Sequence, residues 1–230
     1  MVLNTKHSEI IFGESCWDSL NSYVKTNAYS SVFLLTDTNT KLKCLPLASK
    51  KIEFDFNTLE MQAGEENKHI LSCVSLWNSL SDKGADRKSL LINIGGGVVT
   101  DLGGFVACTF KRGIHFINIP TSLLAMVDAS VGGKTGIDLG ALKNQVGIIR
   151  EPKMVLVDTN FLDTLPDSEY RSGYAEMLKH GLIKEPAYFE ILSVFLNKDE
   201  ILPHIYNSVS LKAQVVSEDM EEHGLRKILN

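Results

Sequence analysis

The hydrophobic positions of this chain form short apolar runs separated by stretches with helical spacing. Several runs are almost wholly apolar, which is typical of strands buried on both faces of a parallel sheet. Between them, apolar residues recur every three or four positions, which predicts amphipathic helices. The pattern predicts strands at 6–12, 31–36, 51–54, 90–94, 114–119 and 154–157, and helices at 14–25, 63–80, 98–110, 167–183, 187–196 and 202–222.

The order of these elements changes near Pro166. Before it, strands alternate with helices, which favours an α/β layer fold. The glycine-bounded segment 139–147 in this part predicts a polar loop. Beyond Pro166 only the helical period remains. We therefore predict an α/β domain over residues 1–166 and an all-helical segment over residues 167–230.

Composition narrows the class of protein. With 44% hydrophobic and 22% charged residues the chain can bury a sizeable core. Its net charge is −5 and its pI about 5.7, and no block of basic residues exceeds a pair such as Lys50-Lys51. The sequence therefore lacks the cluster of basic residues that nucleic-acid binding requires.

The cysteines and the apolar runs indicate a cytoplasmic, soluble chain. Cys16, Cys44, Cys73 and Cys108 form no CxxC pair and lie among apolar neighbours, which predicts buried free thiols. No apolar run approaches the roughly 18 residues that a membrane span needs. The first residues, MVLNTKHSEI, lack the apolar core of a signal peptide.

A glycine turn follows the buried strand at 90–94. Gly95-Gly96-Gly97 leads directly into a helix, with Asp101 one turn later, although Thr100 breaks the GxGxxG pattern. Glycines at a helix N-terminus let a ligand's phosphates approach backbone N–H groups. The alternative is that these glycines only allow the helix to pack closely on the sheet.

Another candidate lies at the end of the strand at 31–36. Asp37, followed by Thr38 and Asn39, suits hydrogen bonds to a ribose or another polyol. An N-cap aspartate that opens the next helix explains the same pattern equally well.

Lysines and an acidic residue gather in the segment after the strand at 114–119. Val131-Gly132-Gly133-Lys134-Thr135 resembles a P-loop, but the position that needs its first glycine holds Asp128. What remains is Lys134 beside Asp128, with Lys143 and Asn144 shortly after. Such donors around one carboxylate suit a phosphorylated polyol, and a solvated lysine loop is the alternative.

The helix predicted at 167–183 carries a dense polar group. Glu176 precedes Lys179 by three residues and His180 by four, so all three share one face. Glu176 is a candidate metal ligand and His180 a possible second one. The alternative is a solvent-exposed helix on which these residues only form salt bridges, which requires the same spacing.

Taken together, these segments are similar to a known family. The runs GGGVVTDLGGFVA, KRGIHFINIPTSLLAMVDASVGGKTGID and GYAEMLKHGLI, with Lys143-Asn144 between them, resemble the 3-dehydroquinate synthase family of sugar-phosphate cyclases. The resemblance implies a Rossmann-like NAD-binding domain and the start of a helical domain that completes a zinc or cobalt site. It also implies a homodimer without nucleic acid or membrane partners.

The family's reaction converts 3-deoxy-D-arabino-heptulosonate 7-phosphate to 3-dehydroquinate and phosphate, in the shikimate pathway to chorismate and aromatic amino acids. NAD oxidises one substrate alcohol transiently and is regenerated, so it acts as a catalyst. Alternatives are another sugar-phosphate cyclase, an alcohol dehydrogenase of the glycerol dehydrogenase type, or a non-catalytic nucleotide-binding fragment.

The resemblance also assigns residues. Those implied to bind NAD are Asp37, Asn39, Glu65, Lys68, Gly96, Gly97, Val98, Asp101, Thr121, Ser122, Leu124, Lys143 and Thr164. Those implied to act on the substrate are Asp128, Lys134, Asn144 and Lys179, with Arg112 reaching a neighbouring subunit's site. Glu176 is implied to be a metal ligand, whereas the family gives His180 no ligand role.

The family's two metal histidines follow a stretch like GLRKILN, which here ends the sequence at Asn230. On this resemblance we expect a C-terminally truncated chain with an incomplete metal site and little or no activity of its own.

Overall fold

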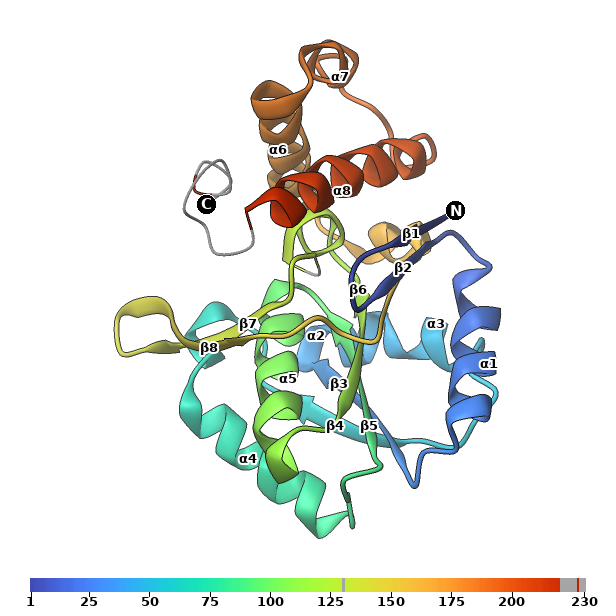
Figure 1. Cartoon of the computed structure of the whole chain (residues 1–230), viewed down its shortest axis with the longest axis vertical. Coiled ribbons are helices and arrows are strands. Elements are labelled where there is room, and N and C mark those ends of the chain that lie inside the picture. Colours follow the sequence, from blue (N-terminus) through green and yellow to red (C-terminus); the bar gives the residue numbers. More distant parts are fainter. Residues whose placement is uncertain (130, 220–226, 228–230) are drawn as a thin grey trace.

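A parallel sheet forms the centre of the molecule (Figure 1). The structure is a computed structural model that describes residues 1–129, 131–219 and 227. The strand order is β1-β2-β9-β6-β5-β3-β4, and β1 alone among these runs antiparallel to its neighbour. The strands are β1 (Val2–Asn4), β2 (Glu9–Phe12), β3 (Val32–Asp37), β4 (Asn57–Met61), β5 (Leu90–Gly95), β6 (His115–Pro120) and β9 (Met154–Val157).

Helices cover both faces of this sheet. Successive strand residues point to opposite faces, and each face packs into its own hydrophobic core. Phe33, Leu35 and Leu91 pack against α4 (Ile70–Asp82) and α5 (Gly97–Thr109). Their neighbours Leu34 and Ile92 belong to a second core, which includes α1 (Cys16–Asn27). Buried runs with apolar residues on both faces are what a doubly covered parallel sheet requires, so the α/β prediction is confirmed.

The predicted strand at 51–54 is wrong. That region holds α2 (Thr38–Lys43), α3 (Leu45–Ser49) and a connecting loop, and the strand that follows is β4. Ile52 and Phe54 are apolar because they pack on the core from the loop. β4 was missed because it is an edge strand, in which only Leu59 and Met61 are buried.

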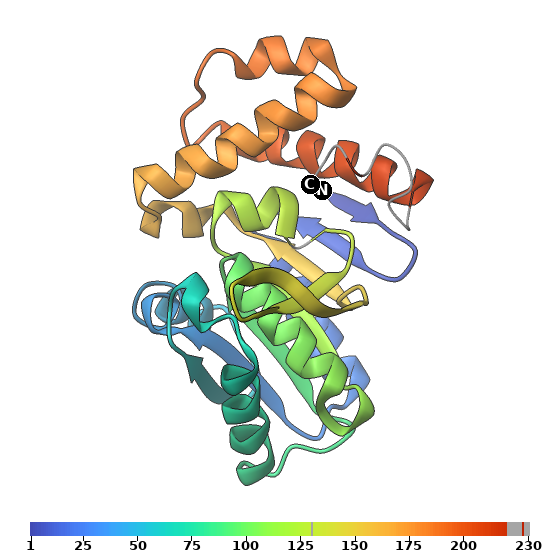
Figure 2. The same ribbon diagram turned by 90° about the vertical axis from the view of Figure 1, so that its left-hand side faces the viewer.

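The predicted polar loop at 139–147 is also wrong. β7 (Lys134–Leu139) and β8 (Leu142–Ile149) form an antiparallel hairpin that lies across α5 (Figure 2). Apart from the half-buried Ile148, all residues of β8 are exposed. A strand without a buried face carries no period of two in its hydrophobic pattern, so the sequence gives little sign of it.

The last described helices gather at one end of the molecule, drawn in orange and red in Figure 1. They are α6 (Asp167–Lys184), α7 (Pro186–Leu192) and α8 (Ile201–Glu218). Each starts within one residue of the prediction, α7 ends four residues before the predicted 196, and the predicted end of the last helix at 222 lies outside the described residues. α6 approaches the turn after β6 so closely that a Cβ on Gly173 would lie 2.4 Å from the Leu124 backbone nitrogen. This contact brings the polar face of α6 to the carboxyl edge of the sheet.

Short turns complete the described chain: η1 (Glu65–Asn67), η2 (Phe110–Arg112), η3 (Ala125–Ala129) and η4 (Thr159–Thr164). All four cysteines are free and buried, as predicted. Within the described residues, no helix has both the length and the hydropathy that crossing a membrane requires.

Candidate active site

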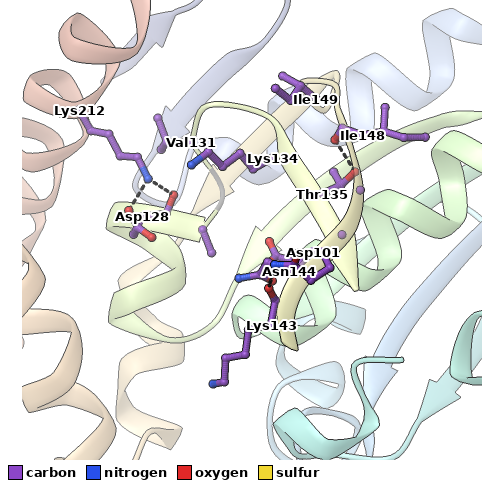
Figure 3. A pocket seen from close by; sticks show the side chains of 14 residues that line it. Asp101, Asp128, Val131, Lys134, Thr135, Lys143, Asn144, Ile148, Ile149 and Lys212 are labelled. Atoms are coloured by element: carbon purple, nitrogen blue, oxygen red, sulfur yellow. Dashed lines mark hydrogen bonds and ion pairs between the residues drawn. The ribbon is translucent and has the colours of Figure 1, made fainter. Parts of the chain in front are cut away.

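Two adjoining cavities lie at the carboxyl edge of the sheet. The sheet-edge cavity, of about 620 Å³, opens over the ends of β3, β5 and β6. The hairpin cavity, of about 790 Å³, lies between β7–β8, η3 and α8 (Figure 3). Asp101, Asp128 and Ala129 line both. A ligand in one cavity would therefore lie next to a ligand in the other.

The predicted cofactor residues line the sheet-edge cavity, apart from Lys143, which lines the hairpin cavity. The cavity wall includes Asp37, Asn39, Glu65, Lys68, Gly96, Gly97, Val98, Asp101, Thr121, Ser122, Leu124 and Thr164. They come from several strand ends and turns that the parallel register brings together. Gly95 at the end of β5, for example, lies opposite Pro120 at the end of β6.

The glycine turn serves packing at one position and leaves open space at the next two. A Cβ on Gly95 would lie 2.5 Å from the Val99 side chain, so the packing explanation holds there. At Gly96 and Gly97 the nearest atoms would be 3.4 Å away, which is ordinary or slightly tight contact. The fold does not need these two glycines, and their missing side chains open the N-terminus of α5 to an anionic ligand.

Asp37 caps the helix α2 and also lines the sheet-edge cavity. Its Oδ1 accepts a hydrogen bond of 2.7 Å from the backbone N–H of Thr40, and the Thr40 hydroxyl completes a capping box at the start of α2. The N-cap prediction is therefore confirmed. Asp37 also lines the sheet-edge cavity, so a polyol contact stays compatible with the cap.

A buried ion pair stands between the two cavities. The Lys68 ammonium donates to Asp101 Oδ2 at 2.7 Å, and the lysine is only 3% exposed. Burial raises the pKa of Asp101 to about 6, while the Lys68 charge acts in the opposite direction. Asp101 can therefore change its protonation state just below neutral pH.

A second pair, missed by the sequence reasoning, closes the hairpin cavity. Lys212 on α8 donates to the backbone carbonyl of Asp128 at 2.7 Å and forms an ion pair with its carboxylate (Figure 3). Burial lowers the pKa of Lys212, and Asp128 offsets part of this effect. Figure 3 shows Lys134 pointing from β7 toward this pair.

The sequence held a signal for Lys212. Ile205, Ser208, Val209 and Lys212 follow one another at helical spacing, and all four are buried. A lysine on the apolar face of a helix needs a partner, because an unpaired buried ammonium is costly. That partner is Asp128, which the sequence had already singled out.

The polar face of α6 lies beside Asp128, at the edge of the hairpin cavity. Glu176 Oε1 lies 2.8 Å from Lys179 Nζ and 3.1 Å from His180 Nε2. His180 is buried, and its Nδ1 shares a hydrogen bond of 2.6 Å with the Ser208 hydroxyl. Burial acts to raise the pKa of Glu176, but His180 and Lys179 outweigh it and hold the pKa below its usual range. Lys179 lines neither cavity and reaches the site through Glu176.

These residues fit a divalent metal ion. Asp128, Glu176 and His180 each offer a ligand atom, and these atoms lie within 4.8 Å of one another. Glu176 Oε1 and His180 Nε2 are buried without a hydrogen bond of normal geometry among the described residues. A carboxylate oxygen and a ring nitrogen that face each other at 3.1 Å, beside a second carboxylate, are a donor set that suits zinc or a similar ion. The structure groups His180 with Glu176, as the helical spacing suggested.

Arg112 lies apart from both cavities. It is exposed, and it follows α5 in a turn where Lys111 and Arg112 both have positive φ, 51° and 70°. Two consecutive left-handed residues other than glycine cost conformational energy, which is typical of functional positions. The structure thus presents Arg112 on the surface, apart from both cavities of its own chain.

The fold and these cavities define a class: an α/β protein with a glycine turn at a helix N-terminus and an adjoining cavity lined by charged residues. The profile described as "3-dehydroquinate synthase N-terminal" matches residues 58–172, and the one described as "3-dehydroquinate synthase C-terminal" matches residues 173–230. The chain belongs to the 3-dehydroquinate synthase family.

Curated relatives agree with this membership. The chain is 44% identical over 227 residues to the 3-dehydroquinate synthase of Parabacteroides distasonis, covering 96% of this chain and 64% of the relative. With that of Prochlorococcus marinus strain SARG it shares 45% identity over 193 residues, covering 79% and 52%. The chain thus spans between about half and two thirds of the length of these relatives.

Solved structures share the fold. A 2-deoxy-scyllo-inosose synthase in complex with carbaglucose-6-phosphate, NAD⁺ and Co²⁺ superposes with a TM-score of 0.86 at 26% identity, covering 96% of this chain and 64% of that one. The 2-epi-5-epi-valiolone synthase ValA of Streptomyces hygroscopicus, with NAD⁺ and Zn²⁺ bound, gives a TM-score of 0.83 at 23% identity, covering 99% and 66%.

Proposed function

We propose that this chain forms the NAD site and part of the substrate site of a 3-dehydroquinate synthase. The reaction would convert 3-deoxy-D-arabino-heptulosonate 7-phosphate to 3-dehydroquinate and phosphate. One observation carries the proposal: the open glycine turn at Gly96 and Gly97 faces a cavity that adjoins a second one lined by Lys134, Asp128 and Lys212. Family membership supports the same reaction.

NAD would occupy the sheet-edge cavity. The N–H groups at the start of α5 would hold its pyrophosphate, since Gly96 and Gly97 leave room for close approach. Asp101 would accept a hydrogen bond from a ribose hydroxyl, and Asp37 and Asn39 would contact the adenosine side. Thr121, Ser122, Leu124 and Thr164 would form the remaining wall.

The substrate would occupy the hairpin cavity. The ammonium groups of Lys134 and Lys212 and the amide of Asn144 suit a phosphorylated, polyhydroxylated molecule, because they are hydrogen-bond donors. Asp128 supplies the matching acceptor for a hydroxyl group. Lys179 would act from α6, beside Glu176.

When bound, NAD would act as a reversible oxidant of one substrate alcohol. A divalent ion held by Glu176 would act as a Lewis acid on the oxygen of that alcohol. The protein's own contribution is to place the substrate beside the cofactor and to keep opposite charges paired around it. Ser208 contributes by fixing the ring of His180 behind Glu176.

We also propose that the protein acts as a homodimer to which Arg112 contributes across the interface. The support is the exposed, left-handed backbone of Lys111 and Arg112, which projects a cation away from its own cavities. The Arg112→Ala variant should then complement a variant that is defective in the hairpin cavity when the two are mixed.

Phosphate release and NADH absorbance together test the function. A full-length family member that contains these residues should release phosphate from the heptulosonate phosphate with substoichiometric NAD⁺ and Co²⁺ or Zn²⁺, without accumulating NADH. Stoichiometric NADH with glycerol would favour an alcohol dehydrogenase. Turnover of a hexose phosphate instead would favour a different cyclase.

A further inference from the structure

Residues near η1 and residues of the β7–β8 hairpin are joined by several bonds, although they lie about 70 positions apart in the sequence. The backbone N–H of Asp138 donates to the carbonyl of Lys68 at 2.8 Å. The Lys68 ammonium donates to Asn144 Oδ1 at 2.7 Å. On the outside, Lys143 Nζ lies 3.3 Å from Glu65 Oε1. The wall of the sheet-edge cavity is thus bonded to the wall of the hairpin cavity.

Lys68 is the buried centre of this junction. Its ammonium holds Asp101, which lines both cavities, and Asn144, which lines the hairpin cavity. The side chain is only 4% exposed, so these protein contacts and not solvent fix its position. A charge-assisted hydrogen bond in such surroundings is strong, and its geometry is well defined.

Asn144 is held in an unusual conformation by these contacts. Its backbone is left-handed, with φ of 54°, and its N–H donates to Asp138 Oδ1 at 2.7 Å. An ammonium can only donate, so the side-chain atom that faces Lys68 must be the amide oxygen. The amide NH₂ group, for which no acceptor is found among the described residues, can then donate into the hairpin cavity that Asn144 lines.

We propose that Lys68 is a positioning residue that couples the two cavities, so that NAD binding orders the hairpin turn and presents the Asn144 amide to the substrate. This rests on the proposed function. A cofactor hydroxyl bonded to Asp101 fixes Asp101, which fixes Lys68, which in turn fixes Asn144. Because coupling between binding sites is reciprocal, a ligand on Asn144 strengthens NAD binding by the same factor.

Hydrogen exchange in the hairpin turn measures this coupling. In the 230-residue chain, saturating NAD⁺ should slow amide exchange over residues 139–146 by roughly fivefold or more. Lys68→Met should abolish this effect. Lys41→Met, which removes an exposed ion pair with Glu60 outside both cavities, should keep it. Calorimetry on each variant confirms that NAD⁺ is bound during the exchange.

Variants of Asn144 test the coupling at the residue that accepts the hydrogen bond from Lys68. Asn144→Gly tolerates the left-handed backbone but removes the acceptor, so NAD⁺ should still bind without slowing exchange in the turn. Asn144→Asp restores an acceptor for Lys68, so the NAD-dependent slowing should return. Equal slowing in wild type and Asn144→Gly would overturn the proposal, as would NAD⁺ binding to wild type without any slowing. Absence of NAD⁺ binding to wild type would instead overturn the proposed function.

Discussion

The two cavities are built in different ways. The sheet-edge cavity is formed by strand ends and backbone turns, and its central feature is the absence of side chains at Gly96 and Gly97. The hairpin cavity is lined by charged side chains from β7, β8, η3 and α8, of which Asp128 and Lys212 form an ion pair. Backbone geometry therefore determines the first cavity, whereas the second depends on charges that separate elements bring together.

This difference predicts which substitutions damage the fold and which damage only binding. Changes to the charged pairs should affect stability most strongly. Changes at the glycine turn should leave stability nearly intact and affect the cofactor.

The largest effect is expected at the Asp128–Lys212 pair. Asp128→Asn leaves the ammonium of Lys212 buried without its counter-charge and should lower the free energy of unfolding by about 2–4 kcal/mol. Lys212→Met leaves a carboxylate that is 35% exposed and should cost only about 1 kcal/mol. Urea unfolding measures both. Equal losses would contradict the asymmetric burial of the pair.

Gly173 should be intolerant to any side chain. A Cβ there would lie 2.4 Å from the Leu124 backbone nitrogen, so Gly173→Ala must push α6 away and should cost about 1–3 kcal/mol. The exposed neighbour provides the control, because Ser172→Ala should change the unfolding free energy by less than about 0.5 kcal/mol. A Gly173→Ala protein as stable as wild type would show that α6 can shift freely.

NAD⁺ affinity should depend on the protonation of Asp101. Its pKa in the fold is about 6, raised by burial from 3.8, so the carboxylate is ionised at pH 7 and mostly protonated at pH 5. If ionised Asp101 accepts the ribose hydrogen bond, affinity should rise with pH and be about tenfold weaker at pH 5 than at pH 7. Calorimetry across this range tests it, and Asp101→Asn should remove the dependence.

Protein stability should respond to Asp101 in the opposite sense. Because the folded pKa lies above the unfolded one, the carboxyl's contribution to stability is present below pH 3.8 and lost as the pH rises through about 6. Opposite slopes of affinity and stability would identify Asp101 as the group responsible for both.

The smallest effect is expected at Lys143. Its ion pair with Glu65 is exposed on both sides, so Lys143→Met should change the unfolding free energy by less than about 0.5 kcal/mol. Lys68→Met in the same junction should cost about 2 kcal/mol, since it leaves the half-buried Asp101 without its counter-charge. Similar losses for the two lysines would mean that burial does not distinguish them.

The sequence predicted the sheet-edge cavity better than the hairpin cavity for a physical reason. Asp37 ends β3, Gly96 directly follows β5, and Asp101 lies in the first turns of α5, so a local pattern of buried strand and turn locates them at one edge. The hairpin cavity depends on contacts between distant elements. Lys212 meets Asp128 across 84 positions and Lys68 meets Asn144 across 76, and no local pattern contains those pairings.

Titration of NAD⁺ into wild type and Gly96→Ala by calorimetry tests the central claim most directly. The added methyl group fits the fold, since a Cβ on Gly96 would lie 3.4 Å from the nearest atom, Ser122 Oγ, but it fills the space at the start of α5. We predict saturable one-to-one binding to wild type, at least about tenfold weaker binding to the variant, and nearly unchanged urea unfolding. Equal NAD⁺ affinity of the two proteins would contradict the assignment of this cavity to the cofactor.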